Sequence, residues 1–342
     1  MKAAFFEEHG GREVLKVGEL AAPEPGPGEA RVEVKAFALN HLDIFVRKGW
    51  PALKLRMPHI CGSDAAGVVE SVGPGVSGLS VGDEVVLSAG VSCGRCLQCL
   101  RGKENYCRKY HLFGEHRSGA GAELFVAPEG NLLPKPQGLD WAQAASLGVA
   151  YLTAWHMLIS RAKVTLGDTV LINGASSGVS VAGIQMARLH GARVIASTSS
   201  EKKAARAREL GASEVIDYTG DDVRSRVKEL TGGQGVDVVL EHVGGEVFET
   251  SMKCLRTGGR LVLCGATAAP KPRIDLRYVF ARHLNVLGAT MGTRAELLEV
   301  LHWVNERSIL PVLDRVISIE EIAEGHRLIE EKQHFGKVVL TL

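Results

Sequence analysis

Four cysteines lie close together in the chain, at spacings that suit a metal ion. They occur within fifteen residues, in the segment Cys93-Gly-Arg-Cys96-Leu-Gln-Cys99 followed by Cys107. Four thiolates complete the tetrahedral shell that zinc prefers, and a complete shell leaves no position open for substrate. Free surface thiols and local disulfides are the alternatives, but the total of seven cysteines is odd and argues against a disulfide framework. The spacing therefore predicts one structural Zn²⁺ bound by Cys93, Cys96, Cys99 and Cys107.

A second segment combines an apolar strand, a turn of small residues and the start of a helix. The strand is Thr169 to Ile172, and the helix begins near Gly178. In this arrangement the free backbone N–H groups and the helix dipole attract the pyrophosphate of a dinucleotide. The full G-x-G-x-x-G pattern is absent, and a tight turn that only packs is the alternative. The predicted cofactor contacts in this segment are Gly174, Ser176, Ser177, Gly178 and Val179.

The next strand, Arg193 to Ala196, indicates which nicotinamide cofactor is bound. An NAD-selective protein usually places Asp or Glu at this strand end, where the acid binds the ribose 2′-hydroxyl. Here hydroxyl-bearing residues follow the strand, and two lysines come soon after. These groups suit a 2′-phosphate, so NADP(H) is favoured over NAD(H), with Thr198, Ser199 and Lys203 as contacts. The alternative for Lys202 and Lys203 is a solvated helix face.

The hydrophobic pattern predicts two kinds of unit that position these residues. Up to about residue 135, Gly and Pro separate short alternating or β-branched runs, which indicates a β-rich, barrel-like unit. From about residue 150, strands alternate with helices, which implies a parallel sheet and an α/β fold. The expected strands include 30–37, 66–72, 83–87, 169–172, 193–196, 214–216, 236–240, 260–264, 285–288 and 337–342, and the expected helices include 179–190, 201–210 and 294–305.

Length and composition indicate the class of protein. A chain of 342 residues with 45% hydrophobic and 23% charged side chains has room for two globular domains. Its 40 Lys and Arg nearly balance 39 Asp and Glu, so no global field attracts nucleic acid or an anionic membrane. The N-terminus lacks a long apolar segment, and no stretch reaches the roughly 18 apolar residues of a membrane helix. We expect a cytoplasmic protein that acts on a small-molecule substrate.

Several motifs together resemble those of the medium-chain dehydrogenase/reductase superfamily, which contains the zinc alcohol dehydrogenases and the quinone oxidoreductases. Besides the cysteines and the Gly174 turn, they are Gly62-Ser-Asp-Ala-Ala-Gly-Val-Val69, Gly73-Pro-Gly-Val76, Val81-Gly-Asp-Glu-Val85, the run 119–126 and Gly258-Gly-Arg260. The resemblance covers nearly the whole chain. It implies a β-rich GroES-like catalytic domain over residues 1–149 and 289–342, a doubly wound Rossmann domain over residues 150–288, and an NAD(P)-dependent oxidoreductase.

The resemblance also raises the question of a second, catalytic zinc, which the alcohol dehydrogenases of this superfamily bind through two cysteines and a histidine. The matching positions here are Asn40, Ser63 and Val149. Because Asn and Ser are poor zinc ligands and Val is none, we expect no conventional catalytic zinc. The pattern is more similar to the quinone oxidoreductases. An unconventional second metal is an alternative, because five possible ligands lie in segments expected to approach one cleft: His41, His59, Cys61, Asp64 and His116.

The predicted reaction is hydride transfer from NADPH to a quinone, an enone or a related carbonyl. Asn40 and Ser63 are expected to donate hydrogen bonds to the oxygen that gains negative charge. His41 is expected to supply the proton or to have a structural role, and Asp43 to orient it or bind the nicotinamide ribose. By family position, Thr153 is expected to line the nicotinamide side. Trp155 is a further such position, with simple packing as the alternative.

Two other functions stay open at this point. One is a zinc-type alcohol dehydrogenase or ketone reductase, and the other is a protein that binds the cofactor without redox chemistry. The strand 285–288 lies where such folds extend their sheet across a two-fold axis, so we expect a homodimer or a homotetramer. Cys254 and Cys264 stand beside apolar residues and are expected to be buried core thiols.

Overall fold

Strand β3 (Glu29–Ala38) is the central strand of the first sheet, because alternate residues along it are apolar and face the core. Val32, Val34 and Ala36 are almost completely buried. In the computed structural model, which describes residues 1–342, this sheet has seven strands in the order β10-β6-β5-β3-β18-β17, with β9 also paired to β3. Most of its pairings are antiparallel, as short hydrophobic runs separated by turns predict.

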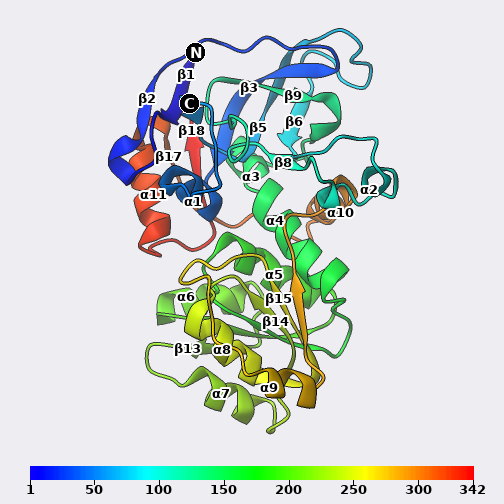
Figure 1. Cartoon of the computed structure of the whole chain (residues 1–342), viewed down its shortest axis with the longest axis vertical. Helices are drawn as coiled ribbons and strands as arrows, with labels where there is room; N and C mark the ends of the chain where they lie inside the picture. The colour runs from blue at the N-terminus through cyan, green and yellow to red at the C-terminus, as the bar shows by residue number, and fades with distance from the viewer. The chain divides into compact units, whose positions relative to one another are not determined.

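The chain divides into two compact units, and the first contains both chain ends (Figure 1). Unit 1 comprises Met1–Leu152 and Thr293–Leu342. Its remaining strands are β1 (Lys2–Phe6), β2 (Lys16–Glu19), β4 (His59–Ile60), β5 (Asp64–Val72), β6 (Glu84–Leu87), β7 (Gly90–Val91), β8 (His111–Leu112), β9 (Leu124–Pro128), β10 (Leu132–Pro134), β17 (Leu313–Ser318) and β18 (Lys337–Thr341). Its helices are α1 (His41–Lys48), α2 (Leu97–Leu100), α3 (Trp141–Ala145), α10 (Arg294–Asn305) and α11 (Ile322–Glu330), and α4 (Gly148–Trp155) leads into the second unit.

Unit 2, Thr153–Gly292, is the α/β part, and its sheet is parallel throughout. The strands are β11 (Thr169–Ile172), β12 (Arg193–Thr198), β13 (Glu214–Asp217), β14 (Val236–Glu241), β15 (Leu255–Leu263) and β16 (Asn285–Gly288). The connecting helices are α5 (Gly178–Leu189), α6 (Glu201–Glu209), α7 (Val223–Leu230), α8 (Gly245–Cys254) and α9 (Leu276–Ala281). The strand order β13-β12-β11-β14-β15-β16 reverses between β11 and β14, which makes the sheet doubly wound.

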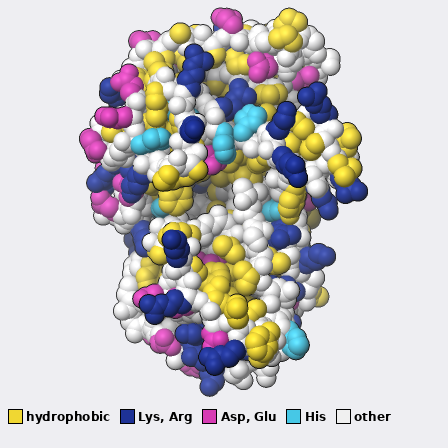
Figure 2. Space-filling model, viewed as in Figure 1, with side chains coloured by type: hydrophobic (Ala, Val, Ile, Leu, Met, Phe, Trp, Pro, Cys, Tyr) yellow, Lys and Arg dark blue, Asp and Glu magenta, His cyan; other side chains and the backbone are white.

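Two elements near the C-terminus were not predicted from the sequence. Strand β17 pairs in parallel with β18, and helix α11 buries Ile322, Leu328 and Ile329. They matter because they hold β18, which pairs with β3 and returns the end of the chain to unit 1. None of the helices is long and apolar enough to cross a membrane. Acidic and basic side chains are interspersed over the face drawn in Figure 2.

Candidate active site and metal centre

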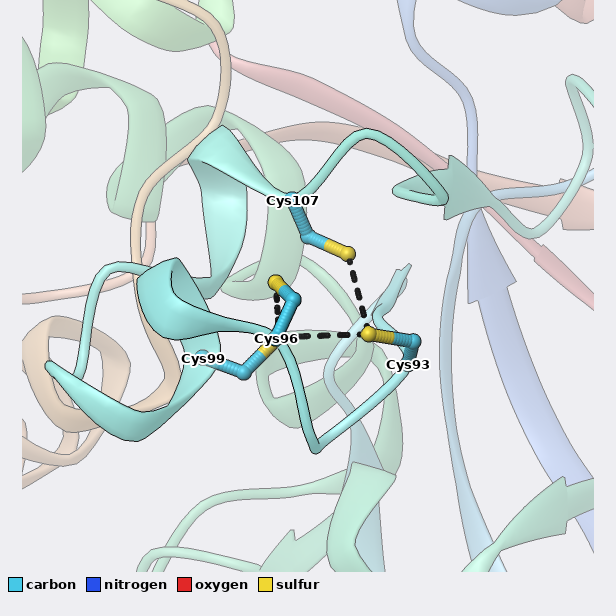
Figure 3. Close-up of side chains that lie close together, drawn as sticks. All are labelled: Cys93, Cys96, Cys99 and Cys107. Carbon is cyan, nitrogen blue, oxygen red and sulfur yellow. Dashed lines mark hydrogen bonds between the residues drawn. The ribbon is translucent and has the colours of Figure 1, made fainter.

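The four cysteines converge, with their sulfur atoms turned toward one another (Figure 3). Sγ of Cys93 lies 3.5 Å from Sγ of Cys107 and 3.9 Å from Sγ of Cys99, and Sγ of Cys96 lies 3.5 Å from Sγ of Cys99. Zn–S bonds of about 2.3 Å in a tetrahedron require S–S edges of about 3.8 Å. The cluster therefore has the dimensions and the donor set of a tetrathiolate zinc site.

Short local elements position these sulfurs. Cys96 precedes the single turn of α2, Cys99 lies within it, and Cys107 follows a 3-10 turn at Glu104–Tyr106. Gly94 has φ of +69°, a conformation that favours glycine, and lets the chain reverse between the first two cysteines. Hydrogen bonds from the backbone N–H groups of Arg95 and Cys96 lower the pKa of the Cys93 thiol, which favours the thiolate that a metal requires.

The residues of the alternative second metal site do not gather in this way. Across the chain, the four cysteines form the only group of three or more Cys, His, Asp or Glu side chains with ligand atoms close enough to share an ion. His59 is buried and its Nε2 lies 3.2 Å from the carbonyl oxygen of Gly114. Burial lowers the pKa of His59 and raises that of Cys61, so both stay neutral near pH 7. Both side chains have the environment of structural residues.

The start of helix α1 gathers polar groups from three distant segments of unit 1. Nδ2 of Asn40 donates to Oδ2 of Asp64 over 2.9 Å, and Nζ of Lys337 donates to the same Oδ2 over 2.9 Å. Lys337 also donates to Oδ1 of Asn40 over 2.6 Å. The backbone N–H of Val149 donates to Oδ1 of Asp64 over 2.6 Å. Of the three positions that match zinc ligands in alcohol dehydrogenases, Asn40 and Val149 thus border a buried ion pair between Asp64 and Lys337.

Asp43 is buried, and its carboxylate is hydrogen-bonded to backbone groups. Its Oδ2 accepts from the backbone N–H of Asn40 over 2.7 Å, and its Oδ1 accepts from that of Gly62 over 2.9 Å. The side chain is 2% exposed, and burial raises its pKa to about 6. One carboxylate oxygen therefore holds the backbone at the start of α1, and the other holds the loop that precedes β5. The predicted role in orienting His41 or binding a ribose stays a prediction.

Ser63 and His41 complete the predicted catalytic set, and their side chains differ in burial. Oγ of Ser63 is fully buried and has no hydrogen-bond partner, so in this structure it is not presented to a substrate. The imidazole of His41 is half-buried and packs edge-on against Phe45, with ring centroids 4.9 Å apart. Asn40 is also half-buried. Of the four predicted catalytic residues, Asn40 and His41 are the two that are accessible.

In unit 2, the glycine turn has the predicted strand–turn–helix geometry. Gly174 follows β11 with φ of +58°, which lets the backbone turn sharply without a clash from a side chain. Ser177 is the N-terminal cap of α5, and its Oγ accepts from the backbone N–H of Ser180 over 3.1 Å. Gly178 and Val179 are the first residues of the helix, and Ser176 is half-buried just before them. Their N–H groups belong to the helix end that favours an anion.

Two residues next to this turn, Glu241 and His242, were not predicted from the sequence. Nε2 of His242, just after β14, lies within 3.1 Å of Oγ of Ser177 and 3.0 Å of Oγ of Ser180. Nδ2 of Asn173 donates over 2.8 Å to Oε2 of Glu241, which is completely buried. The signal was available, because polar residues at the carboxyl ends of adjacent parallel strands lie at the usual ligand edge of such sheets.

The remaining predicted cofactor contacts lie in unit 2. Thr198 ends β12 and is buried, and Ser199 follows it half-buried. Lys203 is half-buried in the first turn of α6, where its backbone N–H donates to Oγ of Ser200 over 3.4 Å. Thr153 is buried and its Oγ1 lies 3.8 Å from the sulfur of Met291. These placements leave the 2′-phosphate contacts as a hypothesis.

The burial of three further side chains in unit 2 can be compared with the prediction. Trp155 is buried against His190, with ring centroids 5.5 Å apart, which is the geometry of the packing alternative. Cys254 is buried as predicted, and burial raises its pKa to about 12. Cys264 is only half-buried, because it follows the end of β15 and does not lie inside the sheet.

Comparisons with known proteins cover the whole chain. Residues 26–137 match the alcohol dehydrogenase GroES-like domain family, and residues 178–306 match the zinc-binding dehydrogenase family. A quinone oxidoreductase of Pseudomonas aeruginosa is 32% identical, over 99% of each chain. A crotonyl-CoA reductase of Streptomyces avermitilis is 31% identical, over 97% of this chain and 83% of its own. A crystal structure described as an NAD-dependent alcohol dehydrogenase superposes with a TM-score of 0.97 at 48% identity, over 100% of each chain.

Proposed function

The chain belongs to the medium-chain dehydrogenase/reductase superfamily and is an NAD(P)-dependent oxidoreductase, and from that premise we propose that it transfers hydride from NADPH to a quinone, an enone or a related carbonyl. The observation that carries this proposal is the buried Asp64–Lys337 ion pair beside Asn40 and Val149. The ammonium of Lys337 occupies Oδ1 of Asn40 and Oδ2 of Asp64, which are oxygens that a divalent cation would need as ligands. Polarisation of the acceptor is then the task of hydrogen-bond donors.

A reduced nicotinamide, when bound, would supply the hydride and with it the two electrons that reduce the acceptor. Asn40 donates a hydrogen bond from Nδ2 to the acceptor oxygen that gains negative charge. His41 gives the proton that completes the reduction, since imidazole exchanges protons near neutral pH. Asp43, which is buried, accepts from the backbone N–H groups of Asn40 and Gly62 and so holds the loops on which Asn40 and Ser63 stand. The four cysteines would hold one structural Zn²⁺, and a shell of four thiolates would leave no position open for the acceptor.

The glycine turn supports a dinucleotide as cofactor, and the residues after β12 favour NADPH. The contacts proposed for the pyrophosphate are Gly174, Ser176, Ser177, Gly178 and Val179, with Thr153 near the nicotinamide. Thr198, Ser199 and Lys203 are proposed for the 2′-phosphate. Two relatives are named for the reduction of a quinone and of crotonyl-CoA, a conjugated thioester, which supports conjugated carbonyl acceptors.

A second candidate is alcohol oxidation or ketone reduction with NAD(H). It is favoured by the 48% identity to the chain described as an NAD-dependent alcohol dehydrogenase. The two candidates differ in cofactor, in acceptor and in the number of catalytic metals, so each is open to direct measurement.

The deciding experiment follows the absorbance of reduced nicotinamide with the purified protein, using NADPH and NADH separately against a quinone, a conjugated enone, an aldehyde and a simple ketone. We expect the highest kcat/KM with NADPH and the quinone or enone. The reverse assay offers NAD⁺ and a series of alcohols. Alcohol oxidation that is faster than quinone and enone reduction, and that stops with a chelator while the structural zinc is retained, contradicts the proposal. Cofactor binding without turnover of any acceptor supports the redox-silent alternative.

We also propose that two copies of the chain pair through strand β16. It is the last strand of its sheet, so one row of its backbone N–H and C=O groups has no strand partner. Val286 on this strand is 43% exposed, and Leu276 and Phe280 on the preceding helix are 70% and 69% exposed. Light scattering after gel filtration tests the pairing. A monomer at micromolar concentration, or a dimer that Val286→Lys does not weaken, contradicts it.

A further inference from the structure

The ammonium of Lys337 is buried in unit 1, where every one of its hydrogens has an acceptor. Its side chain is 2% exposed. It donates to the carbonyl oxygen of Leu39 over 2.8 Å, to Oδ1 of Asn40 over 2.6 Å and to Oδ2 of Asp64 over 2.9 Å. An ammonium has three N–H groups and no acceptor, so these three bonds use it completely. Lys337 is therefore held rigidly and does not itself contact a substrate.

The same bonds determine how the carboxamide of Asn40 is oriented. Its Oδ1 faces Lys337, and its Nδ2 donates to Oδ2 of Asp64 over 2.9 Å. An ammonium can only donate and a carboxylate can only accept, so the reversed amide would place N–H against N–H and oxygen against oxygen. The pair of charges thus selects one of the two amide orientations. In that orientation one Nδ2–H is bonded to Asp64 and the second is not used by this network.

Charge balance makes Lys337 necessary for this arrangement. Asp64 is completely buried, and besides Lys337 and Asn40 it is bonded only to the backbone N–H of Val149. Removal of one partner from a buried ion pair leaves an uncompensated charge, which is much less favourable than losing both. Without the ammonium, the Asp64 carboxylate is expected to rearrange or take up a proton, and the carboxamide of Asn40 then loses its fixed orientation.

We propose that Lys337 is a positioning residue for the reaction: together with Asp64 it fixes the Asn40 carboxamide so that one N–H remains available for the acceptor oxygen. This inference rests on the proposed function, in which Asn40 donates that hydrogen bond. It gives strand β18, at the end of the chain, a role in the reaction. The sequence does not indicate that role, because Lys337 and Asn40 lie far apart in the chain. Lys337 acts through Asn40 and touches neither substrate nor cofactor.

The test is a double-mutant cycle of Lys337→Met and Asn40→Ala, measured as the single-turnover rate of hydride transfer from saturating NADPH. Loss of one preorganised donor lowers such rates by about 100-fold, so the hydride-transfer rate of Asn40→Ala is expected to be lower by roughly that factor. The hydride-transfer rate of Lys337→Met is expected to be lower by at least about tenfold, because a misoriented Asn40 amide loses most of its hydrogen bond to the acceptor oxygen. In the Asn40→Ala background, Lys337→Met is expected to have no further effect on the rate.

The matched control is Arg47→Met, which also removes a buried cation from unit 1. Arg47 is paired with Glu330 over 2.6 Å and makes no bond to Asn40. The Arg47→Met substitution is expected to lower the melting temperature without changing the hydride-transfer rate of the folded fraction. If Lys337→Met does not fold, Lys337→Met combined with Asp64→Leu removes both charges, restores an apolar environment and is expected to keep the reduced rate.

The outcomes separate this inference from the proposed function. If Asn40→Ala leaves the hydride-transfer rate unchanged, the proposed role of Asn40 is wrong. If Asn40→Ala lowers the rate but Lys337→Met does not, or if their effects multiply, the positioning role of Lys337 is wrong while that of Asn40 stands. A loss of melting temperature with an unchanged rate for Lys337→Met assigns the lysine to stability alone.

Discussion

Nε2 of His242 lies 3.0 Å from Oγ of Ser180, which joins the end of strand β14 to the first turn of helix α5. The two residues come from elements that are separated by 62 positions in the chain. The contact also includes Ser177, the N-terminal cap of the helix, at 3.1 Å from the same nitrogen. The imidazole therefore helps to fix the hydroxyl groups at the helix end proposed for the pyrophosphate.

His242→Ala is expected to weaken NADPH binding. The hydrogen bonds to the serine hydroxyls disappear, and one such bond contributes about 1 kcal/mol, or roughly fivefold in affinity. We expect the Kd for NADPH to rise by about that factor, measured by quenching of protein fluorescence, with kcat within about twofold of the wild type. His190→Ala is the control, because His190 lies at the other end of α5 against Trp155. An equal loss in both variants contradicts a specific role for His242.

The preference for NADPH is expected to depend on Lys203 and not on its neighbour Lys202. A charge-assisted bond to a phosphate contributes about 1.5–3 kcal/mol, so Lys203→Ala is expected to lower kcat/KM for NADPH by about tenfold or more. The value for NADH, which lacks the 2′-phosphate, is expected to change by less than about twofold. Lys202→Ala, an exposed residue of the same helical turn, is the control. A wild-type enzyme that prefers NADH overturns the assignment of the cofactor.

One zinc per chain is expected from elemental analysis, and its loss is expected to affect stability more than catalysis. Cys93→Ser removes a thiolate from a shell that has no spare donor. We expect loss of the metal and a melting temperature lower by roughly 5–10 °C, as for a loss of about 3 kcal/mol in a domain of this size. The hydride-transfer rate of the folded fraction is expected to stay within about threefold. Cys254→Ala, outside the cluster, is expected to keep the metal.

Acid is expected to destabilise the protein through His326. The side chain is completely buried, and burial together with the Arg47 cation lowers its pKa from 6.5 to about 3. Below pH 6.5 the unfolded chain takes up a proton that the folded protein does not, so the free energy of unfolding falls as the pH falls toward 3. The slope is about 1.4 kcal/mol per pH unit.

The measurement is the free energy of unfolding in urea at about pH 7.5 and pH 5.5. His326→Gln has no such group to protonate, and it is expected to lose about 1.4 kcal/mol less than the wild type between these values. His302→Gln, which alters an exposed histidine of α10, is the control and is expected to behave like the wild type. Parallel behaviour of all three proteins assigns the acid sensitivity to other groups.

Much of the fold was predictable, because its signals are local. The predicted strand at 285–288 and the predicted helix at 294–305 have the same bounds as β16 and α10, since hydrophobic spacing and a capping box at Thr293 mark them. Helix α11 was not predicted, although Ile322, Leu328 and Ile329 form an apolar face, and β17 was missed with it. Strand β17 is largely exposed and lacks the alternation that identifies a half-buried strand.

The sequence by itself determined the cysteine cluster and the glycine turn, because the interacting residues lie within one short segment and local backbone geometry brings them together. Only the tertiary structure decided how the polar groups around Asn40 are used. Lys337 and Asp64 are 273 positions apart in the chain, and they meet because β18 and β5 both pair with β3. Backbone hydrogen bonds between strands do not depend on side-chain identity, so no sequence motif predicts the contact between Lys337 and Asp64. The contact changes Asn40 from an isolated polar residue into a carboxamide held in one orientation.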